Sequence, residues 1–325
     1  MIVQTRLRAL RPVDALVIAF LFLLSVIILL FTRRASDAVL MIALNAGTCI
    51  AVAALASRAE AGPGKLLRFV HDWYPVVMIF LVFKEVYVII QSDQRLDWDA
   101  LFISIDHAIF GVHPTRWLAQ YSTPAITEIL QIAYASYYFI MLTVGIGVFM
   151  RDGREKFSYV LFVITYGFFI SYLGYIAFPA VGPRFTLHSF DSLDAELPGL
   201  WLTGPIRAFL NAGESIPRGA VHALAIAQRD AFPSGHTEMT LISLYLATRF
   251  RLRSRYILYV FGTLLIISTV YLRYHYFIDL VGGAVAMGVT VWTSPLLVEG
   301  WQAVSGRERG AIREDSGRLM QDGIP

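Results

Sequence analysis

Apolar stretches alternate with short polar segments along most of this 325-residue chain. Each stretch is roughly 15 to 25 residues long and carries few charges, as expected of a helix that crosses a lipid bilayer. Backbone groups inside a bilayer must be satisfied within the segment, so the pattern predicts an all-α, polytopic membrane helical bundle of about eight transmembrane helices. The predicted spans are residues 15–32, 38–57, 74–90, 126–150, 157–178, 236–250, 255–271 and 277–298.

The first two spans form a predicted N-terminal helix pair. Arg6, Arg8 and Arg11 precede the first span, as in a secretory signal, but no small-x-small cleavage site follows it and Arg33 comes directly after it. We therefore expect a retained helix. The polar segment 58–72 then divides the chain into three predicted parts, which are the helix pair with its linker (1–72), a six-helix membrane core (73–299) and a flexible cytoplasmic tail (300–325).

Composition agrees with a membrane protein and excludes other classes. The chain is 57% hydrophobic and 16% charged, and its mean hydropathy is +0.60, which is more apolar surface than one soluble core can bury. A net charge of +3, spread over short clusters, is too small to indicate a nucleic-acid partner. The single cysteine, Cys49, cannot form an internal disulfide.

Two polar clusters flank the sixth and seventh spans. The first is Phe232-Pro233-Ser234-Gly235-His236-Thr237, and the second runs from Tyr271 to Asp279. The two spans are joined by the basic turn 249–255, so they form a hairpin that returns the chain to the side from which it started. The sequence therefore predicts that both clusters lie at one membrane face.

The residue types in these clusters suit phosphoryl transfer through a phosphohistidine. His275 and Asp279 are four residues apart and would share one face of a helix, where the carboxylate holds the imidazole in one tautomer. Such an imidazole can act as a nucleophile. Ser234 is a predicted N-cap whose helix end, with Gly235, can receive phosphate oxygens, and His236 could protonate a leaving oxygen.

Each of these residues could instead have a purely structural role in helix packing. A single histidine in an apolar helix is more often a packed residue than a catalytic one, and Pro-Ser-Gly-His alone is a short match. The combination of this motif, a hydrophobic hairpin and His-x-x-x-Asp followed by Gly282-Gly283 is much harder to obtain by accident. The combination therefore favours catalysis.

At these residues the chain resembles the type 2 phosphatidic acid phosphatase superfamily, whose motifs are KxxxxxxRP, PSGH and SRxxxxxHxxxD. Within it, the chain is most similar to the inositol phosphorylceramide synthase-like branch. The resemblance implies a six-helix phosphatase-type core with His275 as nucleophile, Asp279 as its orienting acid and His236 as general acid. It also implies that Ser234 and Gly235 cradle the phosphate.

The chain departs from the family pattern in the first and third motifs. Arg184 supplies a phosphate-binding arginine, but Ala177 stands at the position of the family lysine and Phe185 at that of the proline. Thr269 stands where the third motif has arginine, and Arg273 is a candidate substitute that also binds phosphate. The expected pocket is less basic than the superfamily's usual one, as in the synthase-like branch.

Polar residues outside the motifs give further candidates. Lys84-Glu85 lies inside the third span, where charges are either functional or paired within the structure, or where the lysine extends to the surface. Segment 179–230 is predicted to cap the site, with short helices near 205–211 and 220–228. Cap residues that could select a head group, each more often a solvated surface residue, are Asp191, Asp194, Glu196, Glu214, His188 and His222.

The distribution of Lys and Arg predicts the orientation. With eight spans, the face that has more Lys and Arg is cytoplasmic by the positive-inside rule, although Arg33-Arg34 runs against it. The motif face is then expected to be non-cytoplasmic. The segments on the predicted cytoplasmic face are the N-terminus, 58–72, 151–156, 249–255 and the tail.

We expect a lipid substrate in the bilayer and no metal or other cofactor, since the sequence shows neither a plausible zinc motif nor a Walker loop. With water as acceptor the enzyme would be a phosphatase, and with a lipid or polyol hydroxyl it would be a phosphotransferase. The resemblance favours transfer. A channel, a transporter or a non-catalytic lipid-binding protein are weaker alternatives, and the oligomeric state stays open.

Overall fold

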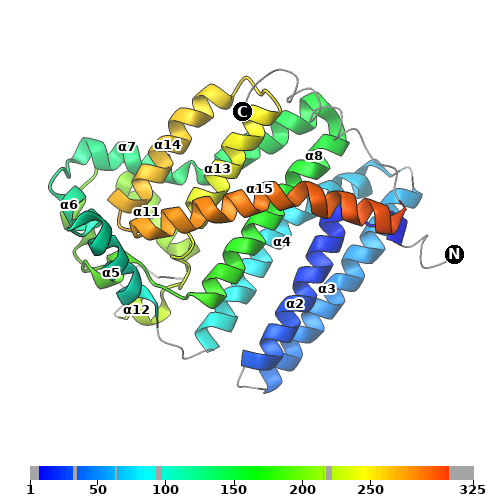
Figure 1. Ribbon diagram of the computed structural model, residues 1–325, viewed down its shortest axis with the longest axis horizontal. Helices are drawn as coiled ribbons and strands as arrows, with labels where there is room; N and C mark the ends of the chain where they lie inside the picture. Colours follow the sequence, from blue (N-terminus) through cyan, green and yellow to red (C-terminus); the bar gives the residue numbers. More distant parts are fainter. Residues whose placement is uncertain are drawn as a thin grey trace. The chain divides into compact units, whose positions relative to one another are not determined.

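The computed structural model describes residues 7–31, 35–62, 64–92, 97–214, 216 and 222–306. In these ranges the regular structure is entirely helical, which confirms the all-α prediction (Figure 1). Five helices are long and apolar enough to cross a membrane, so the chain is a polytopic membrane protein. They are α2 (Pro12–Phe31), α3 (Ala35–Ala61), α4 (Lys65–Ser92), α8 (Tyr137–Ala177) and α15 (Phe277–Ser305).

Two further predicted spans are helices that are shorter than these five. They are α13 (Gly235–Arg249) and α14 (Arg255–Tyr271), with 15 and 17 residues. Arg251 has a φ of 48° in the turn between them, and the two helices pack against each other. The predicted helical hairpin is therefore present.

The prediction of a single fourth span over 126–150 was wrong. Helix α7 (Pro124–Ala135) ends first, and α8 begins at Tyr137. The long α8 is itself broken at Gly153, whose φ of 86° is outside the helical region, so it consists of two arms. The expected charged turn at 151–156 is this break, since a glycine adopts such a φ without steric cost.

The predicted polar linker over 58–72 was also largely wrong. Helix α3 continues to Ala61 and α4 begins at Lys65, so only residues 62–64 lie between them. Two polar residues of the segment, His71 and Asp72, are buried on α4, where each has a partner of opposite charge type. Asp72, for example, is 3% exposed and accepts hydrogen bonds from two arginines. The domain boundaries at residues 72 and 299 remain predictions.

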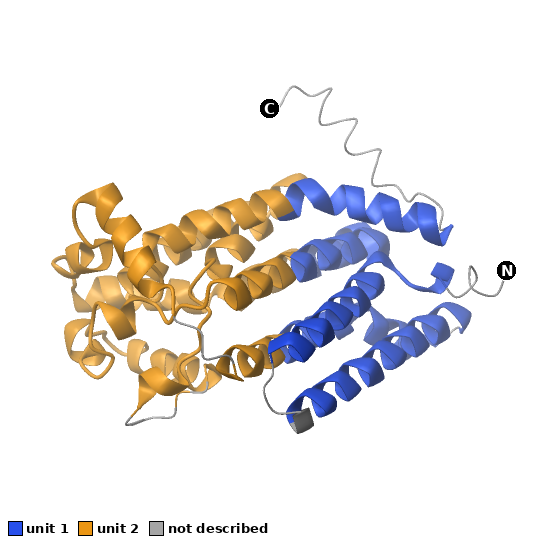
Figure 2. Ribbon diagram, turned by 60° about the horizontal axis from the view of Figure 1, so that its bottom comes forward, with its two compact units in different colours: residues 1–81, 145–166, 290–325 blue, residues 82–144, 167–289 orange. Residues whose placement is uncertain are grey.

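The chain folds as two compact units, and most of the long helices contribute to both (Figure 2). Unit 1 comprises residues 1–81, 145–166 and 290–325, and its helices α2 and α3 pack together. Asn45 of α3 donates a hydrogen bond to Ser25 of α2 at 3.2 Å. Its aromatic packing centres on Trp73, whose ring lies 4.9 Å from that of Phe157.

Unit 2 comprises residues 82–144 and 167–289 and holds all the predicted site residues. Helix α14 packs against α13 and α7, and α7 also contacts α11. A buried cluster of Phe102, Ala180, Ala231 and Tyr276 brings together residues that adjoin the three motifs. The short helices of unit 2 are α5 (Asp99–Phe110), α6 (Pro114–Ala119), α9 (Pro183–Thr186), α10 (Leu193–Glu196), α11 (Thr203–Gly213) and α12 (Ala223–Ile226).

The cap region contains the two short helices that were expected. Helix α11 includes the predicted segment 205–211, and α12 lies within 220–228, of which 220 and 221 are outside the described residues. Lys84 of α4 donates a hydrogen bond to the carbonyl of Gly213, the last residue of α11, at 2.9 Å. A cation at a helix C-terminus is favourable, so this contact fits the structural alternative for Lys84.

Candidate active site

The Pro-Ser-Gly-His motif forms the N-terminus of α13. Ser234 is the N-cap, as predicted, and its side chain accepts a hydrogen bond from the amide of Thr237 at 3.2 Å. The amide of Ser234 donates to the carbonyl of Asp279 at 2.9 Å, so it is not available to a ligand. The amide of Gly235 is directed at the hydroxyl of Tyr175, whereas that of His236 takes no part in these bonds. The helix end can therefore offer the amide of His236 to an anion directly, and that of Gly235 in exchange for Tyr175.

His275 does not lie on a helix, which corrects the expectation that it shares a helix face with Asp279. Helix α14 ends at Tyr271, and Arg273 has a φ of 68°, which turns the chain. His275 follows in irregular backbone between the two helices, while Asp279 is the third residue of α15. Asp279 accepts a hydrogen bond from the amide of Tyr276 at 2.8 Å, and its Oδ2 lies 3.3 Å from Nδ1 of His275.

The carbonyl of Ala231 is the nearer partner of His275. Its oxygen lies 2.9 Å from Nδ1 of the imidazole. A carbonyl oxygen can only accept, so Nδ1 carries the proton and Nε2 of the neutral ring is left with a lone pair. Burial lowers the pKa of His275 to about 4, which keeps the ring neutral at physiological pH.

The two histidines face each other, as the predicted juxtaposition requires. Nε2 of His275 is 3.5 Å from Nδ1 of His236. The ring of His236 is held between two tyrosines, with centroids 4.5 Å from Tyr134 and 4.3 Å from Tyr137. Tyr134 also stacks on Tyr274 at 4.3 Å. The stacked tyrosine rings thus fix the orientation of the His236 imidazole.

Arg184 lies beside the histidines on the short helix α9. Gly182, two residues earlier, has a φ of 89°, and a Cβ there would lie 2.6 Å from the carbonyl oxygen of Tyr274. The amide of Arg184 donates to the carbonyl of Arg273 at 3.0 Å, which ties the first motif to the turn before His275. The close approach requires glycine at position 182.

The guanidinium of Arg184 is buried and only partly satisfied. It lies over the ring of Tyr274 at 4.7 Å, and its Nη2 pairs with Glu214, which follows α11 in the cap. Burial acts to lower its pKa, but Glu214 and Tyr274 raise it, so the group stays charged. Its Nε and Nη1 are buried without a hydrogen-bond partner in the described chain. These two donors can bind an anion.

Arg273 does not join Arg184. Its guanidinium, 1% exposed, pairs with Glu196 of the cap. The role of phosphate ligand therefore stays a prediction for Arg273, and the structure gives this side chain a carboxylate partner instead.

The remaining cap candidates have different surroundings. Asp194 pairs with Arg207, and His188 lies 2.9 Å from the hydroxyl of Thr115 through Nε2. Asp191 and His222 line a separate cavity of about 630 Å³. Of the six candidates, two contact a predicted phosphate ligand: Glu214 pairs with Arg184, and Glu196 pairs with Arg273.

Two aspartates of α5 position the motifs, and the sequence did not single them out. Asp99 accepts hydrogen bonds from the amides of Val181 and Gly182, at 3.0 and 2.9 Å, and from the hydroxyl of Tyr276 at 2.7 Å. Asp106 accepts from the first two amides of α15, at 2.7 and 2.9 Å. Each carboxylate satisfies backbone donors far away in sequence, so no local pattern could have identified it.

Asp230 is a third carboxylate that the sequence did not single out. It directly precedes Ala231, whose carbonyl holds His275. Its side chain accepts a hydrogen bond from its own backbone amide and has no ion-pair partner among the described residues, and the charges of Glu214, Arg184 and His275 act on it. Burial, with a contribution from Glu214, raises the pKa of Asp230 to about 6. An acidic residue four positions before Ser234 was the one available signal.

Comparison with known proteins identifies the family of the chain. The family model described as PAP2 superfamily matches residues 101–293, which is more than half of the chain and includes the histidines, Ser234, Arg184, Asp230 and Asp279. No curated protein and no solved structure matches the chain. Members of this superfamily are typically phosphatases, and the family indicates phosphatase- or phosphotransferase-type activity on lipid phosphates. The chain is a polytopic membrane protein that belongs to the PAP2 superfamily.

Proposed function

We propose that this protein is a lipid phosphotransferase of the inositol phosphorylceramide synthase-like type, which transfers a phosphate-bearing group to a hydroxyl acceptor through a phosphohistidine on His275. The observation that best supports it is the position of Nε2 of His275. This atom bears the lone pair, lies 3.5 Å from His236, and belongs to the same site as the partly unsatisfied guanidinium of Arg184.

In the first half-reaction, Nε2 of His275 attacks phosphorus and the bond to the leaving oxygen breaks. Arg184, through Nε and Nη1, and the amides of Gly235 and His236 bind the other oxygens as charge develops. The imidazolium of His236 gives its proton to the leaving oxygen. Asp279 and the carbonyl of Ala231 keep the nucleophile in one tautomer.

The charge of the site supports a phosphodiester donor. Arg184 is accompanied by Glu214 and Asp230, while Ala177 and Thr269 stand where the family pattern has two further cations. A phosphomonoester would bring a charge of about −1.5 to −2, whereas a diester brings about −1. A site with one arginine and two carboxylates accommodates the diester at a smaller electrostatic cost. Its product is a phosphohistidine that retains one ester group.

In the second half-reaction, we assign the role of base to Asp230. The acceptor oxygen attacks phosphorus, the bond to Nε2 breaks, and the electron pair returns to His275. The proton of the hydroxyl goes to the carboxylate of Asp230 and then back to His236 for the next turnover. Asp230 fits this role better than Glu214, because Glu214 forms an ion pair with Arg184 and Asp230 forms none among the described residues.

The family match supports lipid phosphate hydrolysis as the second candidate. The same phosphohistidine serves both reactions, and water would replace the hydroxyl acceptor beside Asp230. We further propose that the site faces the non-cytoplasmic side, which rests on the distribution of Lys and Arg in the sequence.

The experiment that tests the function uses the purified protein in detergent with a phospholipid labelled at phosphorus and candidate hydroxyl acceptors. The proposal predicts a labelled acceptor lipid, inhibition by vanadate and no product with His275→Ala. Release of inorganic phosphate from a phosphomonoester, without transfer, would establish the hydrolytic alternative. Unchanged turnover by His275→Ala would contradict both.

A further inference from the structure

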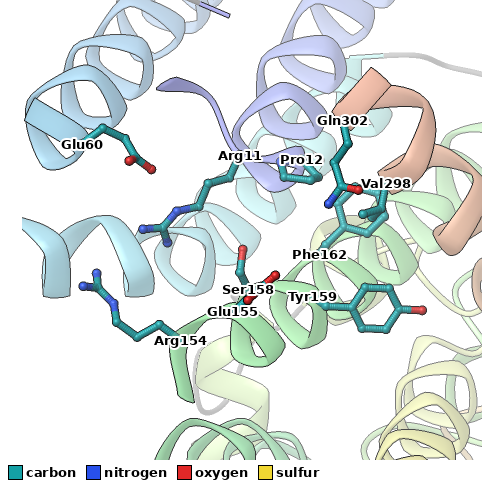
Figure 3. Close-up of a pocket in the computed structure, with 10 residues that line it drawn as sticks. All are labelled: Arg11, Pro12, Glu60, Arg154, Glu155, Ser158, Tyr159, Phe162, Val298 and Gln302. Atoms are coloured by element: carbon teal, nitrogen blue, oxygen red, sulfur yellow. The ribbon is translucent and has the colours of Figure 1, made fainter. Parts of the chain in front are cut away.

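A second polar cavity lies in unit 1, which contains none of the site residues described above. Its volume is about 470 Å³, within the range of small-ligand sites. Pro12 is the first residue of α2, Glu60 is next to the last residue of α3, and Gln302 is in the last turn of α15. Since these helices have membrane-spanning length, their ends place the cavity at a membrane surface. The lining residues are Arg11, Pro12, Glu60, Arg154, Glu155, Ser158, Tyr159, Phe162, Val298 and Gln302 (Figure 3).

Two arginines of this cavity are fixed by one buried carboxylate. Nη1 of Arg11 and Nη2 of Arg154 each lie 2.7 Å from a different oxygen of Asp72, which is 3% exposed. One carboxylate neutralises only one of two guanidinium groups, so the trio keeps an excess positive charge. Nε of Arg154 is a buried donor without a partner in the described chain. The arrangement leaves N–H donors for an anionic ligand.

The backbone near Arg11 is also held rigidly. Asp14 is fully buried and accepts hydrogen bonds from the amide of Arg11 at 2.7 Å and from the hydroxyl of Tyr74 at 2.7 Å. Its two oxygens lie 3.1 and 3.0 Å from Nε2 of His71. The start of α2 is therefore anchored to α4, and Arg11 is positioned before any ligand binds. Such preorganisation lowers the entropic cost of binding.

The other side of the cavity supplies negative charge. Figure 3 shows the carboxylate of Glu60, from α3, and that of Glu155, from α8, on either side of the guanidinium of Arg11. Two cations and two carboxylates thus line one space, and Phe162 and Val298 provide an apolar surface. A purely anionic ligand would be repelled by the carboxylates, whereas a zwitterion with separate charges suits both groups.

We propose that this cavity binds a phosphoethanolamine-type head group, with the phosphate on Arg11 and Arg154 and the primary ammonium on Glu60 and Glu155. A primary ammonium donates hydrogen bonds to carboxylates, which a quaternary ammonium cannot do. The apolar wall and the position at a membrane surface favour a phospholipid as the source over the free phosphoester. The site is separate from the proposed phosphotransferase reaction and does not depend on it.

Native mass spectrometry of the delipidated full-length protein tests this proposal. Separate additions are phosphatidylethanolamine, phosphatidylcholine, phosphatidylglycerol and soluble O-phosphoethanolamine. We expect phosphatidylethanolamine to bind at least tenfold more tightly than the other two lipids. Equal binding of all three lipids would overturn the proposal, and O-phosphoethanolamine binding as tightly as the lipid would identify the free ester as the source.

Variants locate the site. The double variant Arg11→Gln/Arg154→Gln is expected to bind phosphatidylethanolamine at least tenfold more weakly, while Arg253→Gln, an exposed arginine in the turn before α14, is the matched control. The double variant also leaves the buried carboxylate of Asp72 without its two arginine partners, so it could weaken binding through a loss of stability. Glu155→Gln is therefore the second test, because Glu155 has no ion pair among the described residues. It should reduce the preference for phosphatidylethanolamine over phosphatidylcholine. An unchanged preference in Glu155→Gln would overturn the assignment of the ammonium site.

Discussion

At the scale of single residues, His275 and Asp230 should give the two half-reactions different pH dependences. Donor cleavage needs neutral His275, whose pKa is lowered to about 4, and protonated His236, so it should persist as the pH falls towards 4 and weaken as the pH rises. Transfer needs ionised Asp230, whose pKa is raised to about 6, so it should rise with pH through 6. Single-turnover assays that follow release of the leaving alcohol and appearance of the labelled acceptor can separate the two.

Asp230→Asn provides the control for this prediction. It should retain donor cleavage, slow transfer by roughly 10²-fold or more, and remove the rise near pH 6. Asp191→Asn, in the separate cap cavity, should change neither step. Equal slowing of cleavage and transfer by Asp230→Asn would contradict its assignment as the acceptor base.

Gly182 supports a second residue-scale prediction. Its φ of 89° and ψ of 168° belong to a region that essentially only glycine adopts, and a Cβ would meet a backbone oxygen at 2.6 Å. Gly182→Ala should therefore lower the free energy of unfolding by roughly 1 to 3 kcal/mol and displace Arg184 from the site. Thermal unfolding and phosphate-analogue binding measure the two effects. Gly204→Ala, in helix α11 where a Cβ meets nothing within 4 Å, is the control and should neither destabilise the protein nor weaken binding.

The sequence predicted which residues belong to the candidate site better than it predicted the partners of their side chains. His236, His275, Ser234 and Arg184 could be found because their spacing follows a family pattern. That Ala231 is the nearer partner of His275 could not, since its carbonyl reaches the ring only after the chain folds. The carboxylate partners of Arg184 and Arg273 could not be predicted either, because neither ion pair joins residues that are neighbours in sequence.

At the scale of secondary-structure elements, the contact between α15 and the start of α13 determines the geometry of the site. A Cβ on Gly283 would lie 2.5 Å from the carbonyl oxygen of Ser234, whereas one on Gly288 would meet nothing within 4 Å. Gly283→Ala should separate the two elements and reduce turnover by at least tenfold. Gly288→Ala should retain activity and gain up to about 1 kcal/mol of stability from helix propensity. Similar activity of the two variants would show that this close approach is not required.

The existence of the helices could be predicted more reliably than their ends. Long apolar runs identified α2, α3, α4 and α15, but the boundary between α7 and α8 at Ser136 lies inside a continuous apolar run. The chain leaves α14 before His275 because Arg273 adopts a φ of 68°. A non-glycine residue with this conformation has no sequence signal, so the helical placement of His275 was wrong.

At the scale of the whole molecule, the proposed orientation can be tested by cysteine accessibility. In a Cys49→Ala background, Trp201→Cys labels the cap, where Trp201 is 82% exposed, and Arg253→Cys labels the turn between α13 and α14. A membrane-impermeant maleimide should modify position 201 in intact cells and position 253 only after permeabilisation. The reverse pattern would place the site on the cytoplasmic face.

The central claim is that His275 becomes phosphorylated during turnover. The most direct measurement is rapid quenching of the protein with a phospholipid labelled at phosphorus, followed by peptide mapping under alkaline conditions that preserve phosphohistidine. We expect acid-labile label on the peptide containing His275, more label in Asp230→Asn and none in His275→Ala. Product formation by the wild-type protein without label on that peptide, or label that persists in His275→Ala, would contradict this claim.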